Sequence, residues 1–247
     1  MRAIERLIAL LRDPQAAAGV PADAWPAILS VARGEVMLGT LAHHLAGQSL
    51  PPAIAAHLAA AARAADHART LALWEAEMCR RALAPLGIAP ILLKGTAYAA
   101  AGLSNAAGRQ IGDLDILVPR DRLDEGETAL LGAGWEWVKD DAYDQAYYRH
   151  WMHELPPLIH AERDRMVDVH HTILPLTASP RPDAAAMIAD AVPVSRLDDG
   201  PTPPMGLLTL SPSDMVLHCA AHLIADGELD GGLRNLWDFH CLLNCYE

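Results

Sequence analysis

Two aspartates, separated by one residue, are the first group in this sequence with an evident chemical use. Asp113 and Asp115 lie in the segment GDLDILV, whose apolar residues predict a strand. Side chains alternate along a strand, so both carboxylates project from the same face. Adjacent carboxylates repel each other unless a cation lies between them, and Mg²⁺ prefers oxygen ligands and substrate phosphates. A single Asp-x-Asp also fits an exposed strand at a sheet edge, so it does not decide between the two interpretations.

A third carboxylate follows in the segment MVDVHHTIL. Strand alternation places Asp168 and His170 on one face and the intervening valines on the other. If this strand lies beside the first, Asp168 completes a site for two metal ions with Asp113 and Asp115. His170 then lies close enough to contact a bound nucleotide.

A possible anion site lies upstream, where ILLKGTAY predicts a strand followed by a helix. Lys94, Gly95 and Thr96 fall at this junction, where backbone N–H groups and the helix dipole favour an anion and the lysine adds a positive charge. Arg109 lies four residues before Asp113, in a predicted loop that opens toward the same edge. The segment lacks the spacing of the GxxxxGK[ST] phosphate loop, which excludes an ATPase motif of that kind.

The elements that must position these residues predict an α+β protein. Residues 1–86 have helical spacing of alanine and leucine, including two helices within 36–62 that join at a proline pair. Residues 87–176 show a local α/β pattern and a small mixed sheet, ending in two strands around a polar turn at 162–165. Residues 177–247 hold an irregular, Pro- and Asp-rich segment (177–204) and a C-terminal helical region.

The C-terminal helical region has a clear start signal in SPSD. Ser211 is the predicted N-cap, Pro212 occupies the first helical position, and Asp214 completes a capping box. This predicts a helix from residue 212.

Composition narrows the classes of function. The chain has 247 residues, 19 Lys plus Arg against 31 Asp plus Glu, and a formal net charge of −12. Only two residues are lysines, so binding to nucleic acid or to an anionic membrane is disfavoured. The N-terminus predicts an amphipathic helix and no signal peptide, and we therefore expect a cytoplasmic protein. The four cysteines contain no CxxC pair, which favours free thiols in the core over a disulfide or zinc site.

The twelve histidines offer a second metal hypothesis. His218 and His222 have the spacing of HExxH zinc proteases, but Cys219 stands where the catalytic glutamate would be, which favours a partly buried helix face. A second group surrounds the third aspartate and is expected to line the site: His150, His153, His160, His170 and His171.

The ordered motifs resemble the uncharacterised bacterial nucleotidyltransferases of the DNA polymerase β superfamily. The resemblance rests on Leu-Lys-Gly at 93–95, Arg109, Asp-x-Asp at 113–115, Gly-Trp at 134–135 and Asp-Val-His at 168–170. It extends into the C-terminal helices through SPSDMVLHCAAHL and RNLWDFHCLL and covers residues 85–247. The chain departs from the family pattern at Thr96, Trp135 and His171, which concern substrate contacts more than the metal ligands.

The resemblance implies a small mixed-sheet nucleotidyltransferase core flanked by N-terminal and C-terminal helices. It implies two Mg²⁺ ions, with Mn²⁺ as a substitute, held by Asp113, Asp115 and Asp168. It further implies transfer of a nucleoside monophosphate from an NTP such as ATP to a hydroxyl of a small molecule, peptide or protein. Whether Asp168 is a metal ligand or a general base stays open. Two alternatives also stay open: a toxin or antitoxin-type enzyme acting on RNA or protein, and a non-catalytic nucleotide-binding module.

Overall fold

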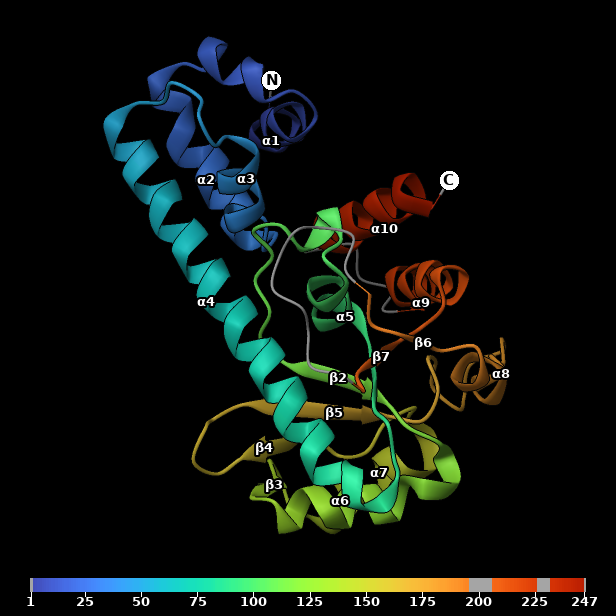
Figure 1. Cartoon of the computed structure of the whole chain (residues 1–247). Helices are drawn as coiled ribbons and strands as arrows, with labels where there is room; N and C mark the ends of the chain where they lie inside the picture. Colours follow the sequence, from blue (N-terminus) through green and yellow to red (C-terminus); the bar gives the residue numbers. More distant parts are fainter. Residues whose placement is uncertain (1, 196–205, 226–231, 247) are drawn as a thin grey trace.

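The computed structural model describes residues 2–195, 206–225 and 232–246. It confirms an α+β fold in which one mixed sheet lies between helices (Figure 1). The helices are α1 (Ala3–Arg12), α2 (Trp25–Gly34), α3 (Leu38–His44), α4 (Pro52–Leu83), α5 (Lys94–Ala101), α6 (Leu123–Gly132), α7 (Ala142–Trp151), α8 (Ala184–Ala189), α9 (Pro212–Ala225) and α10 (Leu233–Tyr246). The strands are β1 (Ile91–Leu92), β2 (Leu114–Leu117), β3 (Trp135–Trp137), β4 (Leu158–His160), β5 (Met166–His170), β6 (Val192–Pro193) and β7 (Leu208–Thr209).

The sheet has the order β3-β4-β5-β2-β1-β7-β6. Strand β2 runs parallel to β5 and antiparallel to β1. Its register pairs Asp115 directly with Asp168, which confirms that the two predicted acidic strands are neighbours. The inner strands are short and almost wholly buried, so their apolar residues fix which face the acidic side chains occupy.

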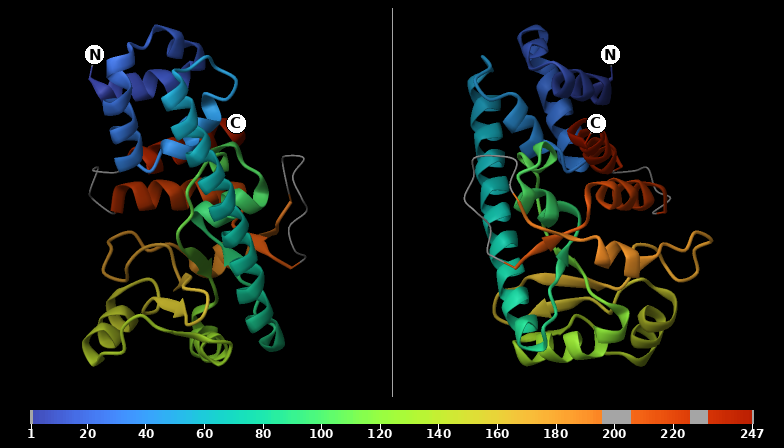
Figure 2. Two further views of the ribbon diagram at one scale, coloured as in Figure 1. Left: turned by 90° about the vertical axis from the view of Figure 1, so that its left-hand side faces the viewer. Right: turned by 45° about the vertical axis from the view of Figure 1, so that its right-hand side comes forward.

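Helix α4 connects the two ends of the molecule (Figure 1). Its N-terminal half packs with α1–α3 in one hydrophobic cluster that includes Trp25, and its C-terminal half packs on the sheet in a second. Figure 2 shows α10 beside the N-terminal helices, and Leu233 and Trp237 of α10 pack against the first cluster. The N-terminal helices therefore reach the core through α10 as well as through α4.

The predicted start of α9 is confirmed. Pro212 is its first residue, the Ser211 hydroxyl accepts a hydrogen bond from the Asp214 N–H at 3.3 Å, and it donates to the Asp214 carboxylate at 2.8 Å. This local cap fixes the helix that lies over the acidic face of the sheet.

Two expectations need correction or extension. Residues 177–204 are not wholly irregular, because α8 and β6 form within them; β6 pairs with β7 and extends the sheet. Residues 196–205 of that segment lie outside the described residues. Helix α7 was not predicted, although Asp141 caps it by accepting hydrogen bonds from the N–H groups of Tyr143 and Asp144.

All four cysteines are unpaired. Cys79 and Cys219 are buried, as expected of core residues, but the expectation is wrong for Cys241, which is half-buried, and for Cys245, which is exposed near the end of α10. Among the described residues, no helix is both long and apolar enough to cross a membrane.

Candidate functional site

Three aspartates meet on one face of the sheet. Asp113 directly precedes β2 and is exposed, Asp115 is buried within β2, and Asp168 is partly buried in β5. One carboxylate oxygen from each lies within 4.8 Å of the others. The predicted carboxylates are thus brought together at a separation that one cation can bridge. We call Asp113, Asp115 and Asp168 the acidic triad.

Asp115 is already compensated by two donors. The Lys94 ammonium lies 2.7 Å and the His170 Nε2 3.0 Å from the same oxygen, Oδ1. Burial alone would raise the pKa of Asp115, but the His170 hydrogen bond and the charge of Lys94 outweigh it and hold this pKa well below its usual range. Burial likewise works against the charge on Lys94, yet attraction to Asp115 leaves the lysine pKa raised. Asp115 and Lys94 are therefore a charged pair.

Asp168 is in the opposite situation. Burial, followed by repulsion from Asp115 and Glu154, raises its pKa from an ordinary 3.8 to about 7. Its Oδ1 is buried and has no hydrogen-bond partner among the residues that the structure describes. A buried carboxylate oxygen without a donor, facing two other carboxylates, fits a divalent cation as the missing partner.

The predicted anion site lies where β1 passes into α5, as expected. Lys94 begins the helix with φ of 46°. The preceding Leu93 N–H donates to the Asp115 carbonyl at 3.0 Å, which ties this junction to the acidic strand. Thr96 is buried, and within the described part of the chain its hydroxyl has no hydrogen-bond partner. The first N–H groups of α5 thus begin beside the acidic triad.

Arg109 lies against this junction. A Cβ on Gly95 would stand 2.6 Å from Arg109 Nε, so glycine is required for the arginine to approach. The guanidinium is held in place because its NH1 donates to the Asp238 carboxylate of α10. Lys94, Arg109 and Asp238 line one small pocket.

The Asp238 carboxylate also binds a second arginine. Arg234 donates to it at 2.6 Å and to the Thr40 hydroxyl of α3 at 2.8 Å. Arg234, Asp238 and Thr40 are all at most 5% exposed. We call Arg109, Arg234, Asp238 and Thr40 the arginine network; it connects the N-terminal helices to the α5 junction.

The histidine group is only partly gathered at the site. His170 is buried and also lies 3.4 Å from the Glu154 carboxylate, with His153 stacked at a tilt beside it. His160 packs edge-on against Trp135, away from the triad, and His150 is exposed on α7. Glu154 was not among the predicted site residues. The one feature of the sequence that points to it is its position beside His153 in HELPP.

His218 lies on α9 over the acidic face. It is buried, and burial together with the nearby positive groups lowers its pKa to about 3, so it is neutral at pH 7. Among the described residues, the groups with metal-binding geometry do not include His218 or His222. This agrees with the expected helix face.

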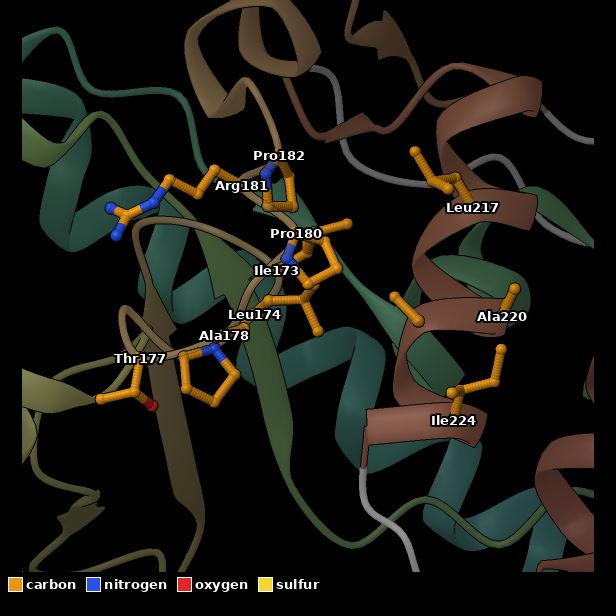
Figure 3. Close-up of a pocket in the computed structure, with 12 residues that line it drawn as sticks. Ile173, Leu174, Thr177, Ala178, Pro180, Arg181, Pro182, Leu217, Ala220 and Ile224 are labelled. Atoms are coloured by element: carbon orange, nitrogen blue, oxygen red, sulfur yellow. The ribbon is translucent and has the colours of Figure 1, made fainter.

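A larger apolar pocket of 640 Å³ opens between the segment after β5 and α9 (Figure 3). Ile173, Leu174 and Pro180 face Leu217 and Ile224 across it. It shares no lining residue with the acidic triad, so its position alone assigns it no part in the chemistry.

The chain was compared with known protein families, protein sequences and solved structures. A similar solved structure is that of the antibiotic-resistance factor ANT(2'')-Ia, with a TM-score of 0.45 and 10% identity over 72% of this chain and 85% of that one. No curated protein sequence matches the chain. A family model described as uncharacterised nucleotidyltransferase matches residues 21–247. The chain therefore belongs to this family of nucleotidyltransferases.

Proposed function

We propose that this protein is a Mg²⁺-dependent enzyme that transfers a nucleoside monophosphate from an NTP, such as ATP, to a hydroxyl of a small molecule, peptide or protein. The observation that carries the proposal is the acidic triad, whose oxygens lie within 4.8 Å of one another and whose Asp168 has no compensating donor. A charge arrangement of this kind costs stability unless a ligand uses it.

Asp113, Asp115 and Asp168 are the residues that would hold two Mg²⁺ ions, or two Mn²⁺ ions in their place. The bound ions supply charge neutralisation for the triphosphate and activation of the acceptor hydroxyl. The remaining steps fall to side chains and backbone groups of this chain.

Lys94 is the group best placed to meet the phosphates. Its ammonium lies 2.7 Å from Asp115, at the edge of the acidic triad, where it would bind a phosphate oxygen of a nucleotide held at the triad. The N–H groups at Gly95 and Thr96 offer the helix N-terminus to the same charge. Arg109, held against Gly95 by Asp238, adds a second fixed positive charge.

In the reaction, the acceptor oxygen attacks the α-phosphorus, the bond from that phosphorus to the β-phosphate bridging oxygen breaks, and pyrophosphate leaves. The hydroxyl proton must go to a base. Asp168, with its pKa of about 7, is suited to this role if it is not bound to metal. His170 donates to Asp115 and keeps that carboxylate in place.

The acceptor is not a polynucleotide in this proposal. Two of the four arginines near the core strands (Arg120, Arg122, Arg163 and Arg165) are engaged: Arg163 pairs with buried Glu75 at 2.7 Å, and Arg122 binds Glu125 at 2.8 Å and the Leu86 carbonyl at 2.9 Å. Arginines that are neutralised internally do not form the positively charged groove that RNA requires. This supports a small molecule, peptide or protein over the toxin-type action on RNA.

A non-catalytic binding module is the remaining alternative. It would bind nucleotide without releasing pyrophosphate. The uncompensated Asp168 argues against it, because a module without chemistry gains nothing from three repelling carboxylates.

The test is an assay of the purified protein with Mg²⁺, each labelled NTP and a cell extract as the source of acceptor. We expect release of pyrophosphate and label on an acceptor, and loss of both in Asp113→Asn and Asp115→Asn. Wild-type rates in these two variants, or no binding of any nucleotide, would contradict the proposal.

A further inference from the structure

A second cluster of possible metal ligands adjoins the acidic triad but differs from it in chemistry. His153, Glu154 and His170 each place one ligand atom within 4.8 Å of the other two. Glu154 Oε2 lies 3.4 Å from His170 Nε2 and 3.9 Å from His153 Nε2, so both imidazoles face the same carboxylate oxygen. Three donors from two chain segments thus point at one place.

The fold builds this arrangement. An isolated β-bridge pairs Glu154 with His170, which fixes the segment after α7 against the end of β5. The His153 and His170 rings lie 5.1 Å apart between centroids. The positions of the three donors are therefore set by backbone pairing and not only by side-chain rotamers.

The donors are not satisfied by one another. His170 is 1% exposed, and its Nε2, the nitrogen that faces Glu154, lies 3.0 Å from Asp115 Oδ1 and 3.4 Å from Glu154 Oε2. His153 Nε2 is 3.9 Å from Glu154 Oε2, beyond hydrogen-bonding distance. Among the residues that the structure describes, no hydrogen bond ends on the Glu154 side chain. Polar groups in such surroundings are nearly always hydrogen-bonded, so the convergence of Glu154 Oε2 and His153 Nε2 without a hydrogen bond between them, beside His170 Nε2, points to an absent ligand.

We propose that His153, Glu154 and His170 form a second metal site, which takes a nitrogen-preferring dication of the Zn²⁺ class. Two imidazoles and a carboxylate suit Zn²⁺ and related transition metals and leave an open position, whereas Mg²⁺ prefers the oxygen-only acidic triad. The two sites meet at His170. A metal bound to its Nε2 takes the nitrogen that now donates to Asp115, so occupancy of the second site removes that hydrogen bond.

The test uses the full, untagged chain, stripped with chelator and free of nucleotide, so its outcome is independent of any transfer activity. Co²⁺ is the spectroscopic probe and Zn²⁺ the competitor, with Mg²⁺ in large excess to fill the acidic triad. We expect one Co²⁺ per chain with visible absorption typical of nitrogen ligation, displaced by Zn²⁺ and not by Mg²⁺. X-ray absorption of the Zn²⁺ form should show two imidazole nitrogens.

The variants His153→Ala and Glu154→Gln should each weaken Co²⁺ binding by at least about 10-fold. Neither side chain makes a hydrogen bond to a described residue that the fold would lose, and circular dichroism checks that each variant is folded. Asp113→Asn is the matched control and should bind Co²⁺ as the wild type does. An oxygen-only shell, displacement by Mg²⁺, or unchanged binding in His153→Ala would overturn the proposal.

Discussion

The acidic triad and the arginine network are both polar clusters inside the molecule, yet their charges are balanced in opposite ways. In the arginine network one carboxylate, Asp238, serves two guanidinium groups, and Thr40 accepts a further hydrogen bond. In the acidic triad three carboxylates share one ammonium and one imidazole, and a buried oxygen of Asp168 has no donor.

The difference suggests that the arginine network stabilises the fold and that the acidic triad binds a ligand. The arginine network joins α3, α10 and the loop before β2, and each oxygen of its carboxylate binds one arginine, so we interpret it as a positioning device, although among the described residues the Nε atoms of Arg109 and Arg234 are buried without a partner. The acidic triad is left with an excess of negative charge that a bound cation, or a proton on Asp168, would remove. Removing a charge from the first should cost stability, and removing one from the second should cost activity.

The largest expected effect is on the arginine network. Asp238→Ala leaves Arg109 and Arg234 without their shared carboxylate in a buried position, and should lower the free energy of unfolding by about 3–5 kcal/mol. Denaturant unfolding followed by circular dichroism measures this. The control is Glu125→Ala, which breaks the exposed pair with Arg122 and should cost less than about 1 kcal/mol. Equal losses of unfolding free energy in the two variants would contradict a stabilising role of the arginine network.

The acidic triad should behave in the reverse way. Asp113 is exposed, so Asp113→Asn should change the free energy of unfolding by less than about 0.5 kcal/mol. It should lower the rate of nucleotidyl transfer by about 10²–10³-fold, because one metal ligand loses its charge. Pyrophosphate release measures the rate, and Asp140→Asn, another exposed acid, is the control that should keep full activity. A stable Asp113→Asn protein with normal activity would contradict the comparison.

Gly95 is where the two clusters touch, so a methyl group there should affect substrate and not the fold. Gly95→Ala forces Arg109 Nε to move from a position 2.6 Å away. We expect KM for the NTP to rise about 10-fold with a smaller change in kcat. Steady-state kinetics at varied NTP measure it. The control is Gly132→Ala on α6, where the new methyl group meets open space, and its KM should equal that of the wild type. If both variants have the same KM, Arg109 does not contribute to nucleotide binding.

The last expected effect is the pH dependence of stability in the metal-free protein. The folded protein keeps the Asp168 proton up to a pKa of about 7, while the unfolded chain releases it near 3.8. The contribution of this group to stability is therefore complete below pH 3.8 and is lost as the pH rises toward 7.

In Asp168→Asn this loss should be absent, which changes the slope of unfolding free energy by less than about 1.4 kcal/mol per pH unit. Chemical unfolding of both proteins at several pH values between 4 and 8, with chelator, measures the difference. Identical slopes would mean that Asp168 is not in the charged environment described.

Much of the site could be predicted because its information is local. Alternation along the segments around Asp115 and Asp168 predicted their faces, and strand-to-helix punctuation predicted the Lys94 junction. The assignment of these residues to catalysis stays a prediction, as do the domain boundaries at 86 and 176.

What the sequence could not reveal depends on contacts between distant segments. Glu154 joins His170 only through a β-bridge, and Arg109 meets Asp238 across 129 residues of sequence separation. Helix α7 was missed because its aromatic and polar residues carry no clear apolar stripe, and none of them is buried.

The central claim is that the acidic triad is a cation and triphosphate site. The most direct measurement is a crystal structure of the protein with Mn²⁺ and a non-hydrolysable NTP analogue, using the anomalous signal of Mn²⁺. We predict Mn²⁺ bound to Asp113, Asp115 and Asp168, with the Lys94 ammonium moved from Asp115 to a phosphate oxygen. Nucleotide bound elsewhere, or no Mn²⁺ at these three carboxylates, would contradict the account.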